Sequence, residues 1–125
     1  NIKPDITDVK DIAMTLETAD YGTISKLSAN QELALSAAEG LAACKNTAIF
    51  SVGSDGTDGP TDAAGGYCDE NTKEKLRRAG MNIYEVLKEN DAYHALQKTG
   101  GLIITGATGT NVNDVAVVLI RRRFL

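Results

Sequence analysis

The sequence predicts a layered α/β domain, with a mixed β-sheet, flanking helices and glycine-rich loops at the strand ends. Three observations support this fold class. Segments with apolar residues at three- and four-residue steps, typical of amphipathic helices, alternate with short runs rich in β-branched residues, typical of buried strands. Glycine-rich segments follow two of these runs, which places loops at the ends of strands. Strands that alternate with helices are characteristic of a layered α/β domain.

The composition fits one globular domain and excludes several classes of protein. The chain has 125 residues, of which 42% are hydrophobic and 24% are charged. Its net charge of -4 argues against a nucleic-acid partner, which requires a basic surface. No apolar run approaches the roughly 20 residues that cross a bilayer, and no signal peptide stands at the start. The two cysteines, Cys44 and Cys68, have neither metal-ligand spacing nor the density of a disulfide scaffold, so we expect a reduced, cytoplasmic setting.

Residues 1–27 are predicted to be a lead-in, and residues 28–125 the α/β domain. In the lead-in, Ile12, Met14 and Leu16 alternate with smaller or polar residues, a period of two that predicts one half-buried strand. Because the chain begins with asparagine, we expect it to be a piece of a longer protein.

The first predicted helix runs from Ser28 to about Cys44. Ser28 followed three residues later by Gln31 fits a capping box. Apolar residues at three- and four-residue steps give the helix one buried face, formed by Leu33, Ala34, Ala37, Ala38, Leu41 and Ala42.

Three shorter helices are predicted in the second half of the chain. Asp69 or Asn71 can cap the first, which ends before Gly80; the others span Asn82–Glu89 and Ala92–Lys98. Asp91 can cap the last of these helices, and the Gly100–Gly101 pair ends it. The only histidine, His94, is expected to be a surface or capping residue.

Three further strands follow from apolar runs. Ala48–Phe50 reads as the end of a buried strand, and Leu102–Ile104 and Val115–Ile120 are continuous apolar runs rich in β-branched residues. Such continuous runs predict strands that are covered on both faces.

Ser51–Gly66, after the first of these runs, predicts a shaped loop rich in glycine and aspartate. Asp55, Asp58 and Asp62 offer the oxygen ligands that Mg²⁺ prefers. Aspartate also favours ordinary turns, but three carboxylates at spacings of three and four favour a site. We therefore predict all three as metal ligands, with Asp58 and Asp62 catalytic.

A second polar loop, Thr105–Asp114, follows Leu102–Ile104. Its hydroxyl, amide and N–H groups suit the carboxylate and hydroxyls of a small hydroxy acid, and we predict substrate binding by Thr108, Gly109, Thr110 and Asn111. A turn between two strands is the alternative reading of the same residues. Two such loops at strand ends suggest one polar site built from both.

Both loops carry a resemblance to a known family. Gly56–Gly65, Asn90–Tyr93 and Thr105–Asp114 resemble, in order and spacing, the C-terminal MOFRL domain of the class II glycerate 2-kinases, a family also labelled hydroxypyruvate reductase. The match runs from about Asn30 to Ile120. Asn30 lies in a segment similar to the family's Gly-Arg-Asn-Gln-Glu, and Thr61 lies in the first loop; the resemblance implies that both bind substrate.

The resemblance implies an enzyme that uses ATP and Mg²⁺ to phosphorylate the 2-hydroxyl of D-glycerate. It also implies a large N-terminal nucleotide-binding-type domain, the partner that this chain lacks. The chain has neither a P-loop nor a Rossmann fingerprint, so we expect it to be inactive alone.

One departure from the family supports an alternative function. Ala29 stands where the family has an arginine suited to neutralising phosphate charge. The alternative is a catalytically inactive, free-standing module that oligomerises or binds a small anion, with a homodimer formed through Val115–Ile120. Under the enzyme reading, Asp58→Asn and Thr110→Ala are expected to abolish ligand binding and to leave folding intact.

Overall fold

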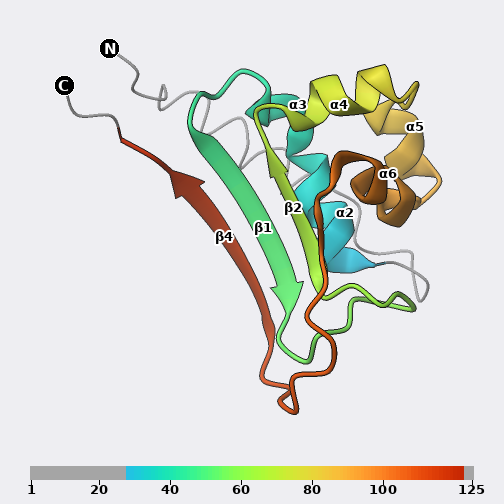
Figure 1. Cartoon of the computed structure of the whole chain (residues 1–125), viewed down its shortest axis with the longest axis vertical. Helices are drawn as coiled ribbons and strands as arrows, with labels where there is room; N and C mark the ends of the chain where they lie inside the picture. The colour runs from blue at the N-terminus through green and yellow to red at the C-terminus, as the bar shows by residue number, and fades with distance from the viewer. Residues whose placement is uncertain (1–27, 123–125) are drawn as a thin grey trace.

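The computed structural model describes residues 28–122, so the predicted lead-in and its strand near Ile12 lie outside the described residues. The described residues form a four-stranded sheet in the order β3-β2-β1-β4, with helices gathered toward the β2 side and β4 at the far edge (Figure 1). In chain order the elements are α2 (Ala29–Ser36), α3 (Ala38–Leu41), β1 (Thr47–Gly53), β2 (Gly65–Asp69), α4 (Thr72–Arg78), α5 (Ile83–Lys88), α6 (Ala92–Thr99), β3 (Leu102–Ile103) and β4 (Asp114–Ile120).

The predicted fold class is confirmed, because helices layer against a sheet whose strand ends carry the glycine-rich loops. One detail differs from the prediction of a mixed sheet. The three strand pairings among residues 28–122 are all antiparallel.

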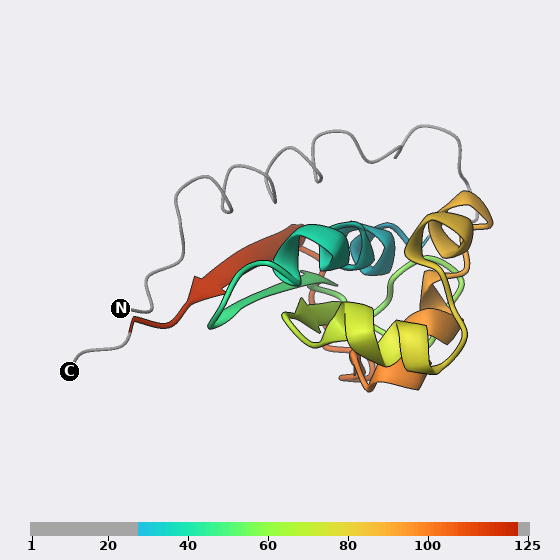
Figure 2. The ribbon, with the colours of Figure 1, turned by 90° about the horizontal axis from the view of Figure 1, so that it is seen from above.

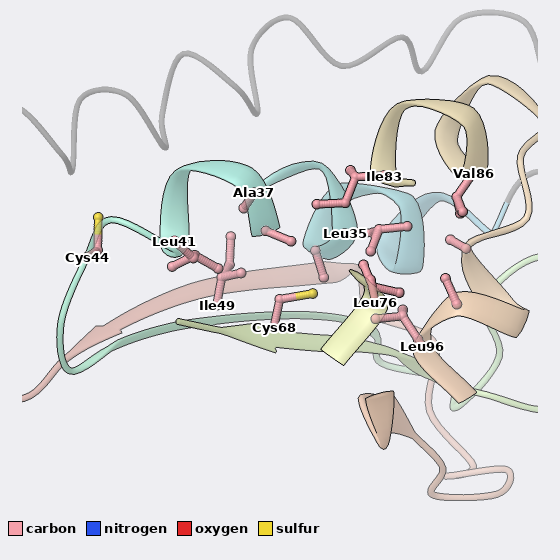
Figure 3. Packing of buried hydrophobic residues seen from close by; sticks show 14 residues of the cluster. Leu35, Ala37, Leu41, Cys44, Ile49, Cys68, Leu76, Ile83, Val86 and Leu96 are labelled. Atoms are coloured by element: carbon pink, nitrogen blue, oxygen red, sulfur yellow. The ribbon is translucent and has the colours of Figure 1, made fainter. Parts of the chain in front are cut away.

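The core lies between the helices and one face of the sheet. Residues of β1 alternate along the strand, with Ile49 and Ser51 buried and Phe50 and Val52 half-buried on the other face. Figure 2 shows α2 and α3 lying along one face of the sheet, and α2 contacts both β1 and β2. Between them, Leu35, Leu41, Ile49 and Cys68 join the core cluster that Figure 3 shows from close by. No helix among residues 28–122 is long and apolar enough to cross a membrane.

Strand β2 was missed by the sequence reading, which placed its first residues in the loop. Glycine usually weakens a strand and marks a close approach of another backbone. A Cβ on Gly65 would lie 1.8 Å from the carbonyl oxygen of Ser51 in β1, and one on Gly66 would lie 2.6 Å from a Leu96 methyl group. The Gly-Gly pair therefore allows β2 to pack against β1 and α6.

The predicted first helix begins where expected, but its cap is different. Ser28 makes no side-chain capping bond, so the predicted capping box is wrong. The helix also breaks into α2 and α3 at Ala37. There, the Ser36 hydroxyl donates to the carbonyl of Leu33 (2.7 Å), a local bond that competes with the helical pattern.

The three later helices are confirmed as α4, α5 and α6, with two differences at their starts. Asn82, where the second of these helices was predicted to begin, caps α5, because its side chain accepts from the N–H groups of Tyr84 and Glu85. Neither Asn71 nor Asp91 makes a side-chain cap, whereas Asp69, the other predicted candidate before α4, accepts from the N–H of Asn71 (2.8 Å). Gly80 and Gly100 follow α4 and α6 with positive φ, as a helix-ending glycine does.

The two C-terminal apolar runs do form strands, but the prediction that both faces are covered is wrong. Both strands lie at edges of the sheet, and among the residues the structure describes nothing covers β4. Exposed fractions are 47% for Val115, 40% for Val118 and 50% for Leu119.

Candidate functional site

The loop after β1 (residues 54–64) and the loop before β4 (residues 104–113) meet at one end of the sheet (Figure 1). Ser54 joins them. Its hydroxyl oxygen accepts from the N–H groups of Val112 (2.9 Å) and Asn113 (3.0 Å). Its carbonyl accepts from the Thr108 hydroxyl, and its own N–H donates to the carbonyl of Asn113 (3.1 Å). The sequence reading missed Ser54, because one serine in a glycine-rich loop carries no distinguishing signal.

The backbones of the two loops also come into contact. The N–H of Thr108 donates to the carbonyl of Asp55 (3.2 Å). A Cβ on Gly56 would lie 2.0 Å from the carbonyl oxygen of Gly106, so only glycine fits there. The two predicted loops are therefore one structural unit.

Asp58 ties the first loop to the start of α2. One carboxylate oxygen accepts from the backbone N–H (3.0 Å) and side-chain amide (3.2 Å) of Asn30, and the other accepts from the N–H of Gln31 (2.8 Å). A carboxylate at a helix N-terminus satisfies unpaired N–H groups and complements the helix dipole. Burial raises the pKa of Asp58 above its ordinary value, while these hydrogen bonds act in the opposite direction. At 3% exposed, Asp58 acts on the helix and not on solvent.

The predicted substrate residues Asn30, which is buried, and Thr61, which is half-buried, belong to the same hydrogen-bond network as Asp58. The side-chain oxygen of Asn30 accepts from the Ser51 hydroxyl (2.6 Å). Thr61 donates to the carbonyl of Asp58 (2.8 Å) and accepts from the side-chain amide of Gln31 (2.9 Å). These residues hold the first loop in shape against α2.

Asp62 and the segment before α6 lie on the exposed side of the same loop. Asp62 is exposed and accepts from the Tyr93 hydroxyl (2.8 Å). His94 is exposed and bonds through Nδ1 to Asp91, as expected for a surface or capping histidine. Asp62 is the predicted catalytic residue whose carboxylate faces solvent.

The three aspartates do not fit a shared Mg²⁺ site as they are placed. Asp58 has both oxygens turned to α2, Asp62 binds Tyr93, and Asp55 accepts from the N–H of Thr57 (2.9 Å) in a local turn. Within residues 28–122 no group of three or more His, Cys, Asp or Glu side chains could hold a metal ion.

The rim of the joined loops is open to solvent. Gly109, Thr110 and Asn111 are all exposed, and Gly109 has a φ of 77°. Beside them, on the sheet face away from α2, lies an open hollow of about 390 Å³ lined by Phe50, Val52, Gly53, Ser54, Ala64, Ile103, Thr105 and Thr108. Its exposed lining is almost wholly apolar, and the hydroxyls of Thr105 and Thr108 donate to the carbonyls of Gly106 and Ser54, so the hollow offers space beside the loops but few polar groups of its own.

A second long-range cap, at Glu32, was also missed by the sequence reading. Its Oε1 accepts from the N–H of Ala92 (3.4 Å), the first residue of α6. Burial raises the pKa of Glu32 from 4.5 to about 7; the Ala92 hydrogen bond lowers this pKa, and the charges of Asp58 and Asp91 raise it. No sequence signal joins two residues that are 60 positions apart.

This raised pKa predicts a pH-dependent stability. Between pH 4.5 and about 7 the folded chain keeps the Glu32 proton that the unfolded chain releases, so the stability that this proton contributes is fully present below pH 4.5 and is lost as pH rises to about 7. Glu32→Gln keeps an acceptor for Ala92 and cannot ionise. Urea unfolding from pH 4 to 8 should therefore show the variant gaining on the parent as pH rises. Parallel curves would contradict the assignment.

The chain is similar to known proteins over most of its length. The MOFRL family profile matches residues 22–114. The chain is 56% identical over 91 residues to a D-glycerate 2-kinase from Thermotoga maritima, covering 73% of this chain and 22% of that protein. A glycerate 2-kinase from Pyrococcus horikoshii is 50% identical over 91 residues, with coverage of 73% and 20%. The chain thus spans about a fifth of the length of these relatives.

Two solved structures share the fold. The crystal structure of a glycerate kinase from Thermotoga maritima matches with a TM-score of 0.72 and 50% identity, over 83% of this chain and 25% of that chain. A crystal structure of a Pyrococcus horikoshii protein matches with a TM-score of 0.75 and 36% identity, over 93% and 31%. By its profile match and these similarities, the chain belongs to the MOFRL family.

Proposed function

We propose that the chain is the C-terminal part of a glycerate 2-kinase-like enzyme, and that its joined loops contact D-glycerate in a cleft shared with a further domain. The observation that carries this proposal is the contact between the two loops, which brings exposed hydroxyl, amide and N–H groups to one end of the sheet. The names of the relatives, D-glycerate 2-kinase and glycerate 2-kinase, support the substrate class.

Within this proposal the predicted site residues divide into three roles. Thr110, Asn111 and the N–H of Gly109 are exposed and would bind the carboxylate or hydroxyls of the substrate. Thr108, Asn30 and Thr61 position the loops through the hydrogen bonds described above. Asp62 is the outward carboxylate available to the reacting groups.

ATP and Mg²⁺ would be held mainly by the further domain. A divalent cation would neutralise phosphate charge during transfer. Because the aspartates of this chain do not fit a common metal site, no step of the proposal depends on a metal held by this chain alone. The cytoplasmic location stays a prediction.

A reconstitution assay tests the proposal. The chain would be mixed with the Thermotoga maritima D-glycerate 2-kinase truncated before its MOFRL region, and ATP-dependent phosphorylation of D-glycerate measured. We expect activity only when both parts are present. The same truncated enzyme with its own C-terminal part is the positive control; activity with that part but none with this chain would contradict the proposal.

Thr110→Ala is expected to weaken D-glycerate binding about tenfold, because it removes one hydroxyl hydrogen bond at the rim. Calorimetric titration of the assembled parts measures the dissociation constant. Thr57→Ala, an exposed threonine of the first loop whose side chain makes no bond in the described residues, is the matched control. Equal affinities in the two variants would remove Thr110 from the site.

The alternative function is a free-standing module that binds a small anion or oligomerises. One observation favours it over catalysis: α2 begins at Ala29, where the family resemblance implies an arginine. The Asp58 carboxylate already occupies the N–H groups of Asn30 and Gln31, so that helix end is not available to an anion. An inactive reconstituted pair, together with an active positive control, would support this alternative function.

A further inference from the structure

Strand β4 is exposed on its outer edge and on both faces among residues 28–122. It pairs only with β1, through a continuous register from Thr47 opposite Ile120 to Gly53 opposite Asp114. Val115 and Leu119 are 47% and 50% exposed on one face, and Val118 and Ile120 are 40% and 43% exposed on the other. Such an edge presents unpaired N–H and C=O groups to a second strand.

This edge also lacks the features that keep edge strands apart. Proteins usually protect an exposed edge with lysine, proline, a bulge or a very short strand. The sequence of β4, Asp-Val-Ala-Val-Val-Leu-Ile, has neither lysine nor proline, and its pairing with β1 has no bulge over seven residues. The other edge strand, β3, has only two residues.

The charges at the two ends of β4 are opposite. Asp114 begins the strand, and Arg121 and Arg122 follow it, with Arg121 continuing the pairing through its N–H to the carbonyl of Asn46 (2.8 Å). Neither Asp114 nor Arg122 has an ion-pair partner in the described part of the chain. Two such strands placed antiparallel would bring each acidic end beside a basic end.

We propose that β4 pairs antiparallel with β4 of a second copy of this chain, making one sheet continuous across a two-fold axis. A two-fold axis normal to the sheet keeps the faces of both strands, so a residue can lie opposite only a residue of its own face. The axis therefore passes between one residue, such as Val117 or Val118, and the same residue of the second copy. It does not pass midway between Val117 and Val118. These two choices give different partners for the charged ends.

The charges select the register centred on Val118. In that register Asp114 lies opposite Arg122 of the second copy, and this ion pair occurs twice. Val117 then lies opposite Leu119, and Ala116 opposite Ile120, so apolar side chains meet on both faces. In the register centred on Val117, Asp114 would lie opposite Ile120, and its charge would stay unpaired. Opposite charges directly across an antiparallel pair stabilise it.

Sedimentation equilibrium of the chain alone tests the pairing, without ligand or further domain, so the result does not depend on the proposed function. We expect a dimer of the 13.2 kDa chain. Asp114→Arg and Arg122→Asp, taken singly, should each raise the dimer dissociation constant about tenfold or more, and the double variant should restore it, because the pairs re-form with charges exchanged. Lys88→Asp, an exposed site on α5, is the control for net charge.

Cross-linking gives a second measurement that does not depend on charge. Val118→Cys should form a disulfide-linked dimer on mild oxidation, because Val118 lies opposite its own copy. Leu119→Cys, on the other face and of similar exposure, should not. A monomeric chain, or a double charge variant as weak as the single ones, would overturn the proposal.

Discussion

Asp58→Ala is expected to lower the free energy of unfolding by about 3 kcal/mol, as the loss of a buried helix cap bonded through a carboxylate predicts. The variant leaves the N–H groups of Asn30 and Gln31 without a partner at the start of α2. It also frees the first loop from the helix. Part of the free energy of these hydrogen bonds is offset by the cost of burying the charged carboxylate, the same burial that raises its pKa. Urea unfolding followed by circular dichroism measures the effect.

Asp62→Ala is the matched control, since it removes another aspartate of the same loop at an exposed position. It loses only the hydrogen bond from the Tyr93 hydroxyl, so its expected effect is within about 0.5 kcal/mol. If the two variants unfold alike, Asp58 is not the cap of α2. The structure also revises the expectation that Asp58→Asn would leave folding intact. The two carboxylate oxygens of Asp58 accept from the backbone N–H groups of Asn30 and Gln31, so the side-chain NH₂ group of an asparagine would face one of these donors.

Gly56→Ala is expected to cost about 2–4 kcal/mol and to separate the two loops. Its φ of 87° disfavours a side chain, and its Cβ would lie 2.0 Å from the carbonyl oxygen of Gly106. Because both colliding groups belong to the backbone, one loop must move. Thermal unfolding gives the stability, and amide shifts of residues 105–114 report the movement.

Gly106→Ala separates the two causes. Gly106 also has a positive φ, 70°, but a Cβ there would meet nothing within 4 Å. Its expected cost is the backbone strain alone, about 1–2 kcal/mol. Equal losses in both variants, with unchanged amide shifts in the second loop, would mean that the loops do not depend on this contact.

The sequence predicts the helices well because their signals are local. Periodic apolar residues, and Gly80 and Gly100 as helix ends, all act within a few residues. The sheet was predicted less fully. Gly65 and Gly66 look like loop residues, and only the nearby backbone of Ser51 and the side chain of Leu96 explain why glycine begins a strand there.

For the candidate site, the sequence correctly predicts that the two loops meet but not what each side chain does. The two loops do meet, yet Asp58 and Asn30 turn inward to hold α2. Their roles depend on contacts between residues 28 positions apart, which no local pattern encodes. The same holds for Glu32 and Ala92. A run as apolar as β4 predicts cover, and its exposed position at an edge is visible only in the assembled sheet.

A two-dimensional amide NMR titration of this chain with D-glycerate and Mg²⁺ tests the joined-loop site most directly. We expect saturable shifts in both loops together, residues 54–64 and 104–113, with one shared dissociation constant, and smaller shifts at β4. The Gly56→Ala variant should lose the shared response, whereas Gly106→Ala should keep it. Flat spectra at millimolar ligand, or shifts in one loop only, would contradict the claim that the two loops form one substrate-binding site.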